Sequence, residues 1–252
     1  MKILIAIIAA LFAGAGHAAA ANINPQALAA FDAGRYDETE TLAVAEDDAV
    51  HLALAARALN AKAYLEADDK AAKRLLKRAQ KLAEEAAERD PALADAWLQG
   101  AVAMGQRASR LSAMRAFMSG LGGGSREKLD TALELDPENP WVLSTSGGWH
   151  FAVATRAGEG RFGSDSSVGL EHYRGARTFA PENVAIAYEM ARRILTHGEP
   201  DWRDEALSVL EVAATAAPAN AFDEALQTRA LELKQAIASG AEAEKAFLDA
   251  QP

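Results

Sequence analysis

The sequence contains no cysteine among its 252 residues. Disulfide bonds and thiolate metal sites are therefore excluded, and so is lipoprotein anchoring, which requires an acylated cysteine. The alternation of apolar and polar residues that marks a half-buried strand is not sustained anywhere in the chain. Apolar residues make up 50% of the composition but aromatic residues only 6%. An alanine-rich chain with these features predicts an all-α fold.

Positive charge is also scarce. The chain has 36 acidic residues against 26 lysines and arginines, which gives a formal net charge of −10. Binding to nucleic acid requires clustered positive charge to neutralise the phosphates. We therefore expect no nucleic-acid partner, and otherwise the acidic balance mainly favours solubility.

The first residues have the layout of a secretory signal peptide. Lys2 precedes an apolar run from Ile3 to Gly16, and small residues follow. An uncleaved membrane anchor is the alternative, but it needs about 20 apolar residues, and His17 interrupts the shorter run found here. We expect residues 1–21 to be removed by cleavage between Ala18 and Ala21. This predicts a periplasmic or secreted protein with no integral membrane segment after cleavage.

Apolar residues recur at three- and four-residue spacing in most of the chain after residue 25. In "AAKRLLKRAQKLAEEAAERDP", leucines and alanines occupy one face and charged residues occupy the other. This pattern predicts an amphipathic helix over residues 69–89 that ends before Pro91.

Four prolines mark an internal repeat, because each follows the end of a predicted helix. An alanine stands five residues before every one of them, a usually larger residue eight before, and a small residue twelve before. The prolines are Pro91, Pro137, Pro181 and Pro218, preceded at twelve, eight and five residues by Ala79, Ala83 and Ala86; Ser125, Leu129 and Ala132; Gly169, Tyr173 and Ala176; and Ala206, Leu210 and Ala213.

This pattern resembles the tetratricopeptide repeat (TPR) over about residues 50–238. The most specific match is "ALELDPENP", with Gly147 ten residues past its proline. "AWLQGAVAMGQRASRL" and "ALELDPENPWVLSTSGGWHF" also resemble the helical-repeat domain of regulators of microtubule dynamics and of periplasmic transporter-associated repeat proteins. The resemblance implies paired antiparallel helices stacked as an α-solenoid.

The spacing departs from the family. The prolines lie 46, 44 and 37 residues apart, against a TPR period of about 34. The extra residues fall in "MRAFMSGLGGGSR" and "RAGEGRFGSDSS", so the array should be irregular. We expect a partial or capping repeat over 22–48, the TPR-like domain over 49–238, and a helical or frayed tail over 239–252.

The glycine-rich stretch "GLGGGSREK" does not form a phosphate loop of the nucleotide-hydrolase type, because it lacks Gly-Lys-Ser/Thr and follows a predicted helix. We interpret residues 120–126 as a flexible joint between helices. An anion site at the helix N-terminus, with Ser125 as its cap and Arg126 nearby, is the alternative.

No pattern in the sequence indicates catalysis. The histidines lack the spacing of a zinc site, and "SGGWH" lacks the G-x-S-x-G elbow. We therefore expect no metal, no cofactor and no enzymatic activity. An enzyme with residues 120–126 and 158–167 as lids is a less favoured alternative, and it would require His150, His172 and a carboxylate to meet in one cleft.

The TPR resemblance implies a binding groove lined by the first helix of each unit. Counting from the closing prolines places two arginines at the same position in successive units, with aromatic residues beside them. We expect these residues to bind a protein segment or a small anionic ligand, as in a scaffolding protein. The predicted groove residues are Trp141, Phe151, Tyr188, Arg192, Phe222 and Arg229.

Three alternatives remain for these residues. The stripe that contains Trp141 and Trp149 has the helical spacing of core packing. The arginines can form ion pairs with neighbouring glutamates instead of facing a ligand. Finally, the two tryptophans can line a closed apolar pocket, as in a small-molecule carrier or a transport-associated component.

Overall fold

The computed structural model describes residues 23–250, apart from the side chains of Ala113 and Phe117. The expected signal peptide lies outside the described residues. Within them the chain forms thirteen α-helices and two short 3-10 helices and no strand, which confirms the all-α prediction. In chain order these are α1 (Pro25–Asp32), α2 (Tyr36–Glu46), α3 (Ala49–Leu65), α4 (Asp69–Arg89), α5 (Ala94–Ser109), α6 (Ala113–Met118), α7 (Leu121–Leu135), α8 (Pro140–Ala157), η3 (Arg161–Gly163), α9 (Ser166–Phe179), α10 (Val184–His197), η4 (Pro200–Trp202), α11 (Arg203–Thr215), α12 (Ala221–Ser239) and α13 (Ala241–Asp249).

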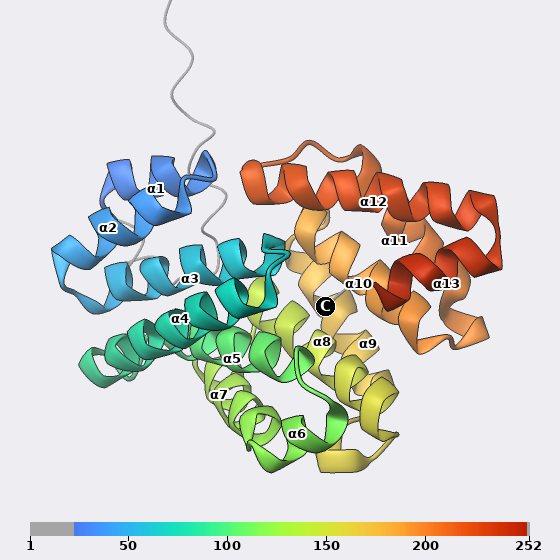
Figure 1. The fold of residues 1–252 in the computed structure, drawn as a ribbon, viewed down its shortest axis with the longest axis horizontal. Helices are drawn as coiled ribbons and strands as arrows, with labels where there is room; N and C mark the ends of the chain where they lie inside the picture. Colours follow the sequence, from blue (N-terminus) through green and yellow to red (C-terminus); the bar gives the residue numbers. More distant parts are fainter. Residues whose placement is uncertain (1–22, 251–252) are drawn as a thin grey trace, which may run out of the picture.

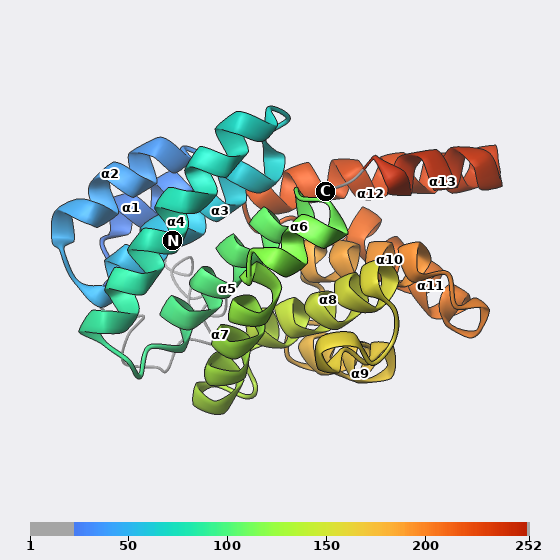
Figure 2. The same cartoon turned by 60° about the horizontal axis from the view of Figure 1, so that its bottom comes forward.

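The helices are arranged as successive hairpins (Figure 1). The pairs α3/α4, α5/α7, α8/α9 and α10/α11 correspond to the four units that end at the repeat prolines. The extra residues of the two long units lie inside their hairpins. The short helix α6 separates α5 from α7, and the turn with η3 separates α8 from α9 (Figure 2).

The repeat register predicts the core of each hairpin correctly. The alanines five residues before the prolines are fully buried in all four units, and the residues eight before them are at most 1% exposed. The residues twelve before the prolines are buried as well. The second helix of each unit therefore packs on its partner through the same three positions.

Small residues allow α8 and α9 to cross closely. A Cβ atom at Gly147 would lie 2.8 Å from both the Gly169 carbonyl oxygen and a ring carbon of Tyr173, and one at Gly169 would lie 2.9 Å from the Cβ of His150. Both distances are too short for real atoms, so glycine is required on both sides of this crossing.

An asparagine begins the first helix of three successive units. Asn139, Asn183 and Asn220 are the N-caps of α8, α10 and α12. The side chains of Asn139 and Asn220 each accept from two backbone amides of the first turn, and that of Asn183 accepts from one. Because these amides have no partner within the helix, the cap fixes where each helix begins.

The glycine-rich stretch is not the joint that the sequence suggested. Gly120, with a φ of 68°, is the N-cap of α7, and the following glycines lie inside the helix. Ser125 is not a cap, because its hydroxyl is buried and donates to the Ala101 carbonyl oxygen at 2.9 Å. Residues 121–126 therefore form the first turns of α7, and only Gly120 supplies the backbone freedom of a joint.

The end of the array returns to its beginning. The turn between α1 and α2 contains Gly34, with a φ of 72°, and a Cβ atom there would lie 3.0 Å from the Cβ of Ala221 at the start of α12. Phe222 packs against the cluster formed by Tyr36 of α2 and by Ala58 and Ala61 of α3. In an open solenoid each repeat contacts only its neighbours, whereas here α12 contacts the first helices (Figure 1).

Candidate functional site on the inner face of the array

The first helices of the units share one side of the array, which we call the inner face. It comprises residues from α3, α5, α8, α10 and α12. Because α12 returns to α3, the half of this face that α10 and α12 contribute is closed by the chain's own side chains. The residues of the inner face discussed below are Arg57, Asn60, Tyr64, Asp95, Gln99, Trp141, Phe151, Tyr188, Glu189, Arg192, Phe222 and Arg229.

The structure brings the predicted aromatic residues together, as the register implied. Phe151 and Tyr188 are at most 1% exposed and belong to one hydrophobic cluster, and the half-buried Trp141 and Phe222 pack against the same cluster. Phe151 and Tyr188 thus contact protein rather than solvent, whereas Trp141 and Phe222 remain partly exposed. Phe151 and Tyr188 are therefore core residues, and a binding role for the four residues stays a prediction.

Arg192 is held inside the protein by an ion pair. It is 2% exposed, and its guanidinium donates to Glu189 one turn earlier, with an NH2 to Oε2 distance of 2.8 Å. Burial alone would raise the pKa of Glu189, but the charges of Arg192 and Arg193 outweigh it and lower the pKa to about 2. Arg192 thus forms the ion pair with a neighbouring glutamate that was the alternative to ligand binding.

Arg229 has a different environment. Its guanidinium lies 5.0 Å from the centre of the Tyr64 ring, in the geometry of a cation–π contact. Its NH1 group is buried and has no hydrogen-bond acceptor, and the same holds for the hydroxyl of Tyr188. Arg229 is therefore the arginine of the predicted pair whose charge no carboxylate balances within the described residues.

Tyr64 of α3 connects these groups, and sequence reasoning missed it. Its hydroxyl donates to Glu189, and its ring packs edge-on against Phe222 with centroids 5.7 Å apart. Burial and the charge of Glu189 raise the pKa of Tyr64 well above its ordinary value, so the hydroxyl keeps its proton. The predicted groove residues lie at fixed distances after the closing prolines. The first of these prolines, Pro91, comes after α3, so the repeat pattern predicted no groove residue on this helix.

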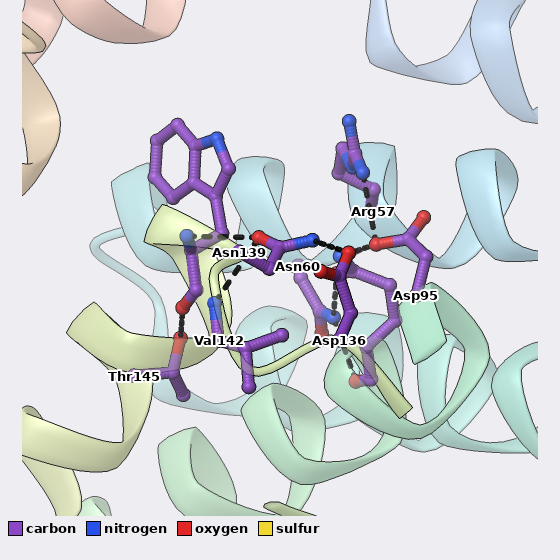
Figure 3. Close-up of polar contacts among 9 residues, drawn as sticks. Arg57, Asn60, Asp95, Asp136, Asn139, Val142 and Thr145 are labelled. Carbon is purple, nitrogen blue, oxygen red and sulfur yellow. Dashed lines mark hydrogen bonds and ion pairs between the residues drawn. The ribbon is translucent and has the colours of Figure 1, made fainter. Parts of the chain in front are cut away.

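The part of the inner face formed by α3, α5 and α8 is more polar and more open. Arg57 donates to Asp95 at 2.8 Å, and their side chains are 29% and 16% exposed. Gln99 donates to Asp95 at 2.9 Å and accepts from Asn60 at 3.1 Å, so the four residues form one chain of hydrogen bonds (Figure 3).

Trp141 lies at the edge of this polar strip. Asn139 accepts from the backbone amide of Trp141 at 3.0 Å and donates to Asp136 at 3.0 Å (Figure 3). These bonds fix the start of α8 and the backbone position of Trp141. Asn60, only 3% exposed, has an Oδ1 atom without any donor. The strip therefore offers one partly exposed ion pair and one half-buried indole, and the unpartnered acceptor of Asn60 is buried.

Trp149, on the same stripe as Trp141, is a packing residue. It is 8% exposed, its Nε1 donates to the Gly122 carbonyl oxygen at 3.1 Å, and Arg126 covers its ring. A hollow of about 370 Å³ lies elsewhere, between Trp202 and the segment of α9 from Ser167 to Arg174. Neither Trp141 nor Trp149 lines it.

His150 and His172 come close together but do not form an acid–base arrangement. Their ring centroids are 5.8 Å apart, and within residues 23–250 neither ring hydrogen bonds to a carboxylate. His150 accepts from the Asp165 amide at 3.0 Å, and its other nitrogen faces Arg126. Burial, together with the charge of Arg126, lowers the pKa of His150 to about 4. The cluster therefore holds the α8–α9 hairpin together.

The described residues contain neither a cluster of metal-ligating side chains nor a helix suited to span a membrane. No group of three or more histidine, aspartate or glutamate side chains is placed to hold a metal ion. Of the helices in residues 23–250, none has both the length and the apolar composition needed to span a bilayer.

A model of the family described as regulator of microtubule dynamics protein 1-3 matches residues 32–161, slightly more than half of the chain. The chain belongs to this family. No curated protein matches its sequence.

Membership in this family confirms the resemblance to regulators of microtubule dynamics, whereas the resemblance to periplasmic transporter-associated repeat proteins stays a prediction. The match runs from the end of α1 to the start of η3. It therefore includes Tyr64, Trp141 and Phe151 but not Arg192 or Arg229, and the TPR relationship itself stays a prediction.

Proposed function

We propose that this member of the regulator of microtubule dynamics family is a binding or scaffolding protein without catalytic activity. In this proposal a protein segment binds the inner face along the strip formed by Arg57, Asp95 and Trp141. The observation that carries the proposal is the partial exposure of this hydrogen-bonded strip on an inner face that is otherwise packed with aromatic and aliphatic side chains. Polar groups at a fixed spacing beside a half-buried indole suit recognition of an extended segment.

Unpartnered groups support the same proposal. The Oδ1 atom of Asn60 is buried without a donor, and it could accept a hydrogen bond from the backbone of a bound segment only if neighbouring side chains move aside. The buried NH1 group of Arg229 has no acceptor, and it could donate to the carboxylate of a small anionic ligand only if the side chains that cover it move aside. A buried polar group without a partner costs about 1–3 kcal/mol, so a ligand that supplies the partner gains that amount.

A photo-crosslinking experiment in the native cell tests the binding surface. A photoreactive residue replaces Arg57 in one variant and the exposed Lys77 on the outer side of α4 in the control variant. We expect a specific crosslinked protein from position 57 and none from position 77. Crosslinking of the same proteins from both positions would refute the assignment of the inner face.

Charge variants test the same residues by a second route. Arg57→Ala and Arg229→Met should each reduce capture of the crosslinked partner, whereas Lys77→Glu should not. Arg192 is unsuitable for this purpose, because its substitution would leave Glu189 buried without its ion-pair partner. Unchanged capture by folded Arg57→Ala and Arg229→Met would exclude both residues from binding.

The proposal includes a periplasmic or secreted location, which the N-terminal sequence supports. Sequencing the N-terminus of the protein from its native cell tests this point. We expect the mature chain to begin between Ala19 and Asn22. An intact N-terminus on a cytoplasmic protein would contradict the proposed location. The proposed binding surface on the inner face would not be affected by that result.

A further inference from the structure

The short helix α6 carries the two most exposed large apolar side chains of the described residues. Met114 is 68% exposed and Met118 is 77% exposed. Because they are four residues apart on one helix, they lie on the same face. α6 contacts α7. The two methionines are thus a protruding apolar pair that the fold does not bury.

The stretches of sequence that flank α6 lack acidic residues, although Asp69 of α4 reaches Arg110 at the end of α5. No aspartate or glutamate occurs between Asp95 and Glu127, or between Glu138 and Glu159, although the chain as a whole is acidic. The first interval contains α5, α6 and the start of α7, and the second contains α8. Together, the two intervals without acidic residues therefore include the ends of α5 and α8 that flank α6.

Two arginines beside the methionines are not balanced by carboxylates. Arg115 is exposed on α6 itself. Arg156 of α8 donates to the Ala108 carbonyl oxygen at 3.3 Å and to the Leu111 carbonyl oxygen at 2.5 Å, which places its charge where α5 ends and α6 is about to begin. Within the described residues neither arginine lies within ion-pair distance of an acidic side chain.

The neighbouring arginines differ in this respect. Arg110 pairs with Asp69 at 3.0 Å, and Arg126 pairs with Asp130 at 2.8 Å. Their charges are already satisfied inside the protein. Met114, Arg115, Met118 and Arg156 therefore form a distinct surface, which we call the α6 surface, with exposed apolar side chains and uncompensated positive charge.

We propose that the α6 surface binds an acidic protein segment that presents apolar side chains. The positive charge selects an acidic partner, because an acidic chain otherwise repels one. The methionines favour a protein rather than a lipid bilayer, since flexible thioethers adapt to different apolar side chains, whereas interfacial membrane helices use mainly Trp, Phe and Leu. This surface is separate from the inner face and does not depend on the function proposed for it.

The test uses the full-length chain and a labelled synthetic helical peptide made of leucine and glutamate in an amphipathic pattern. Fluorescence anisotropy measures its binding at low salt. We expect saturable binding that weakens as salt is raised. The same peptide with every glutamate replaced by glutamine should bind at least about tenfold more weakly.

Four variants assign the binding to the α6 surface. The double variant Met114→Ser/Met118→Ser should weaken binding by about tenfold or more, because it removes two side chains that become buried on binding. Arg115→Glu should weaken it by about fivefold. The matched controls, Leu231→Ser at another exposed apolar side chain and Lys77→Glu at another exposed cation, should leave binding unchanged.

Several outcomes would overturn the proposal. One is the absence of saturable peptide binding, and another is binding that survives the α6 substitutions. A third is binding to vesicles of anionic phospholipid, lost in Met114→Ser/Met118→Ser, without binding to the peptide, which would assign the surface to a membrane. The last is a concentration-dependent oligomer, measured by sedimentation, that Met114→Ser/Met118→Ser abolishes. Such an oligomer would show that the surface binds a second copy of the chain.

Discussion

Tyr64 donates a hydrogen bond to Glu189 across 125 residues of sequence, and this bond joins α3 of the first complete hairpin to α10 of the fourth. Glu189 in turn holds Arg192, and Arg229 covers the Tyr64 ring. Arg192 and Arg229, the two arginines that the repeat register identified, therefore belong to one group of contacts centred on Tyr64 and Glu189. The array is closed on this side, and its open polar strip lies on the other part of the inner face.

Removing the Tyr64 hydroxyl should destabilise the protein. Tyr64→Phe deletes a hydrogen bond to a charged acceptor, so the free energy of unfolding should fall by about 1.5–3 kcal/mol. Tyr188→Phe is the matched control, because the Tyr188 hydroxyl is buried without a partner and its loss should be neutral or stabilising. Urea denaturation measures both. Equal destabilisation by the two variants would show that the Tyr64 bond has no special role.

The charge of Glu189 should make stability depend on pH in acid. Its pKa is lowered from 4.5 to about 2 in the folded protein. A carboxyl whose folded pKa is depressed stabilises the protein fully above the unfolded value. This contribution should therefore be lost as pH falls from about 4.5 towards 2. Urea denaturation across this range measures the loss.

Glu189→Gln is the corresponding variant. It leaves Arg192 buried without its counter-ion, and it should cost about 3–5 kcal/mol near neutral pH. The variant should also lack the Glu189 part of the acid dependence. If the variant and the parent protein lost stability in parallel between pH 4.5 and 2, the ion pair would not be the cause.

His150 should also reduce the free energy of unfolding as pH decreases, but in a higher pH range than Glu189. Its pKa falls from 6.5 to about 4 on folding, so the unfolded chain takes up the proton first as pH decreases. Its contribution is complete above about pH 6.5 and is lost between 6.5 and 4. NMR titration of the histidine ring signals measures the pKa directly. A ring that titrates near pH 6.5 in the folded protein would contradict its burial beside Arg126.

The crossing of α8 and α9 should not tolerate a side chain at Gly147. Gly147→Ala forces a Cβ atom against the backbone of Gly169, and this should cost about 1–3 kcal/mol. Gly123→Ala is the control, because a Cβ atom there meets nothing within 4 Å, and in a helix it should stabilise by up to about 1 kcal/mol. Thermal unfolding of both variants should therefore shift in opposite directions.

Much of the core could be predicted because packing imposes a period on the sequence. The alanines before the prolines and Gly147 are small since the helices of each hairpin approach closely there. The start of α7 could not be predicted in the same way. Consecutive glycines usually mark a joint, but here Ser125 bonds to Ala101 of the adjacent α5 and helps keep this first turn helical.

The closure of the inner face could not be predicted from the repeat pattern. It depends on the contact of Phe222 and Arg229 with Tyr64, and a period within the chain records contacts between neighbouring units only. The register placed Arg192 and Arg229 at equivalent positions, yet only Arg192 has a glutamate three residues earlier on its own helix. The two arginines therefore have different environments, because the residues next to them on their helices differ.

A double-mutant cycle of Tyr64→Phe and Glu189→Gln tests the closed array most directly. The free energies of unfolding of the parent protein, the two single variants and the double variant give the coupling between α3 and α10. Residues in direct contact should show a coupling energy of about 0.5–3 kcal/mol. Single-variant effects that add within about 0.3 kcal/mol would show that the two residues do not meet in solution, and the array would then be open.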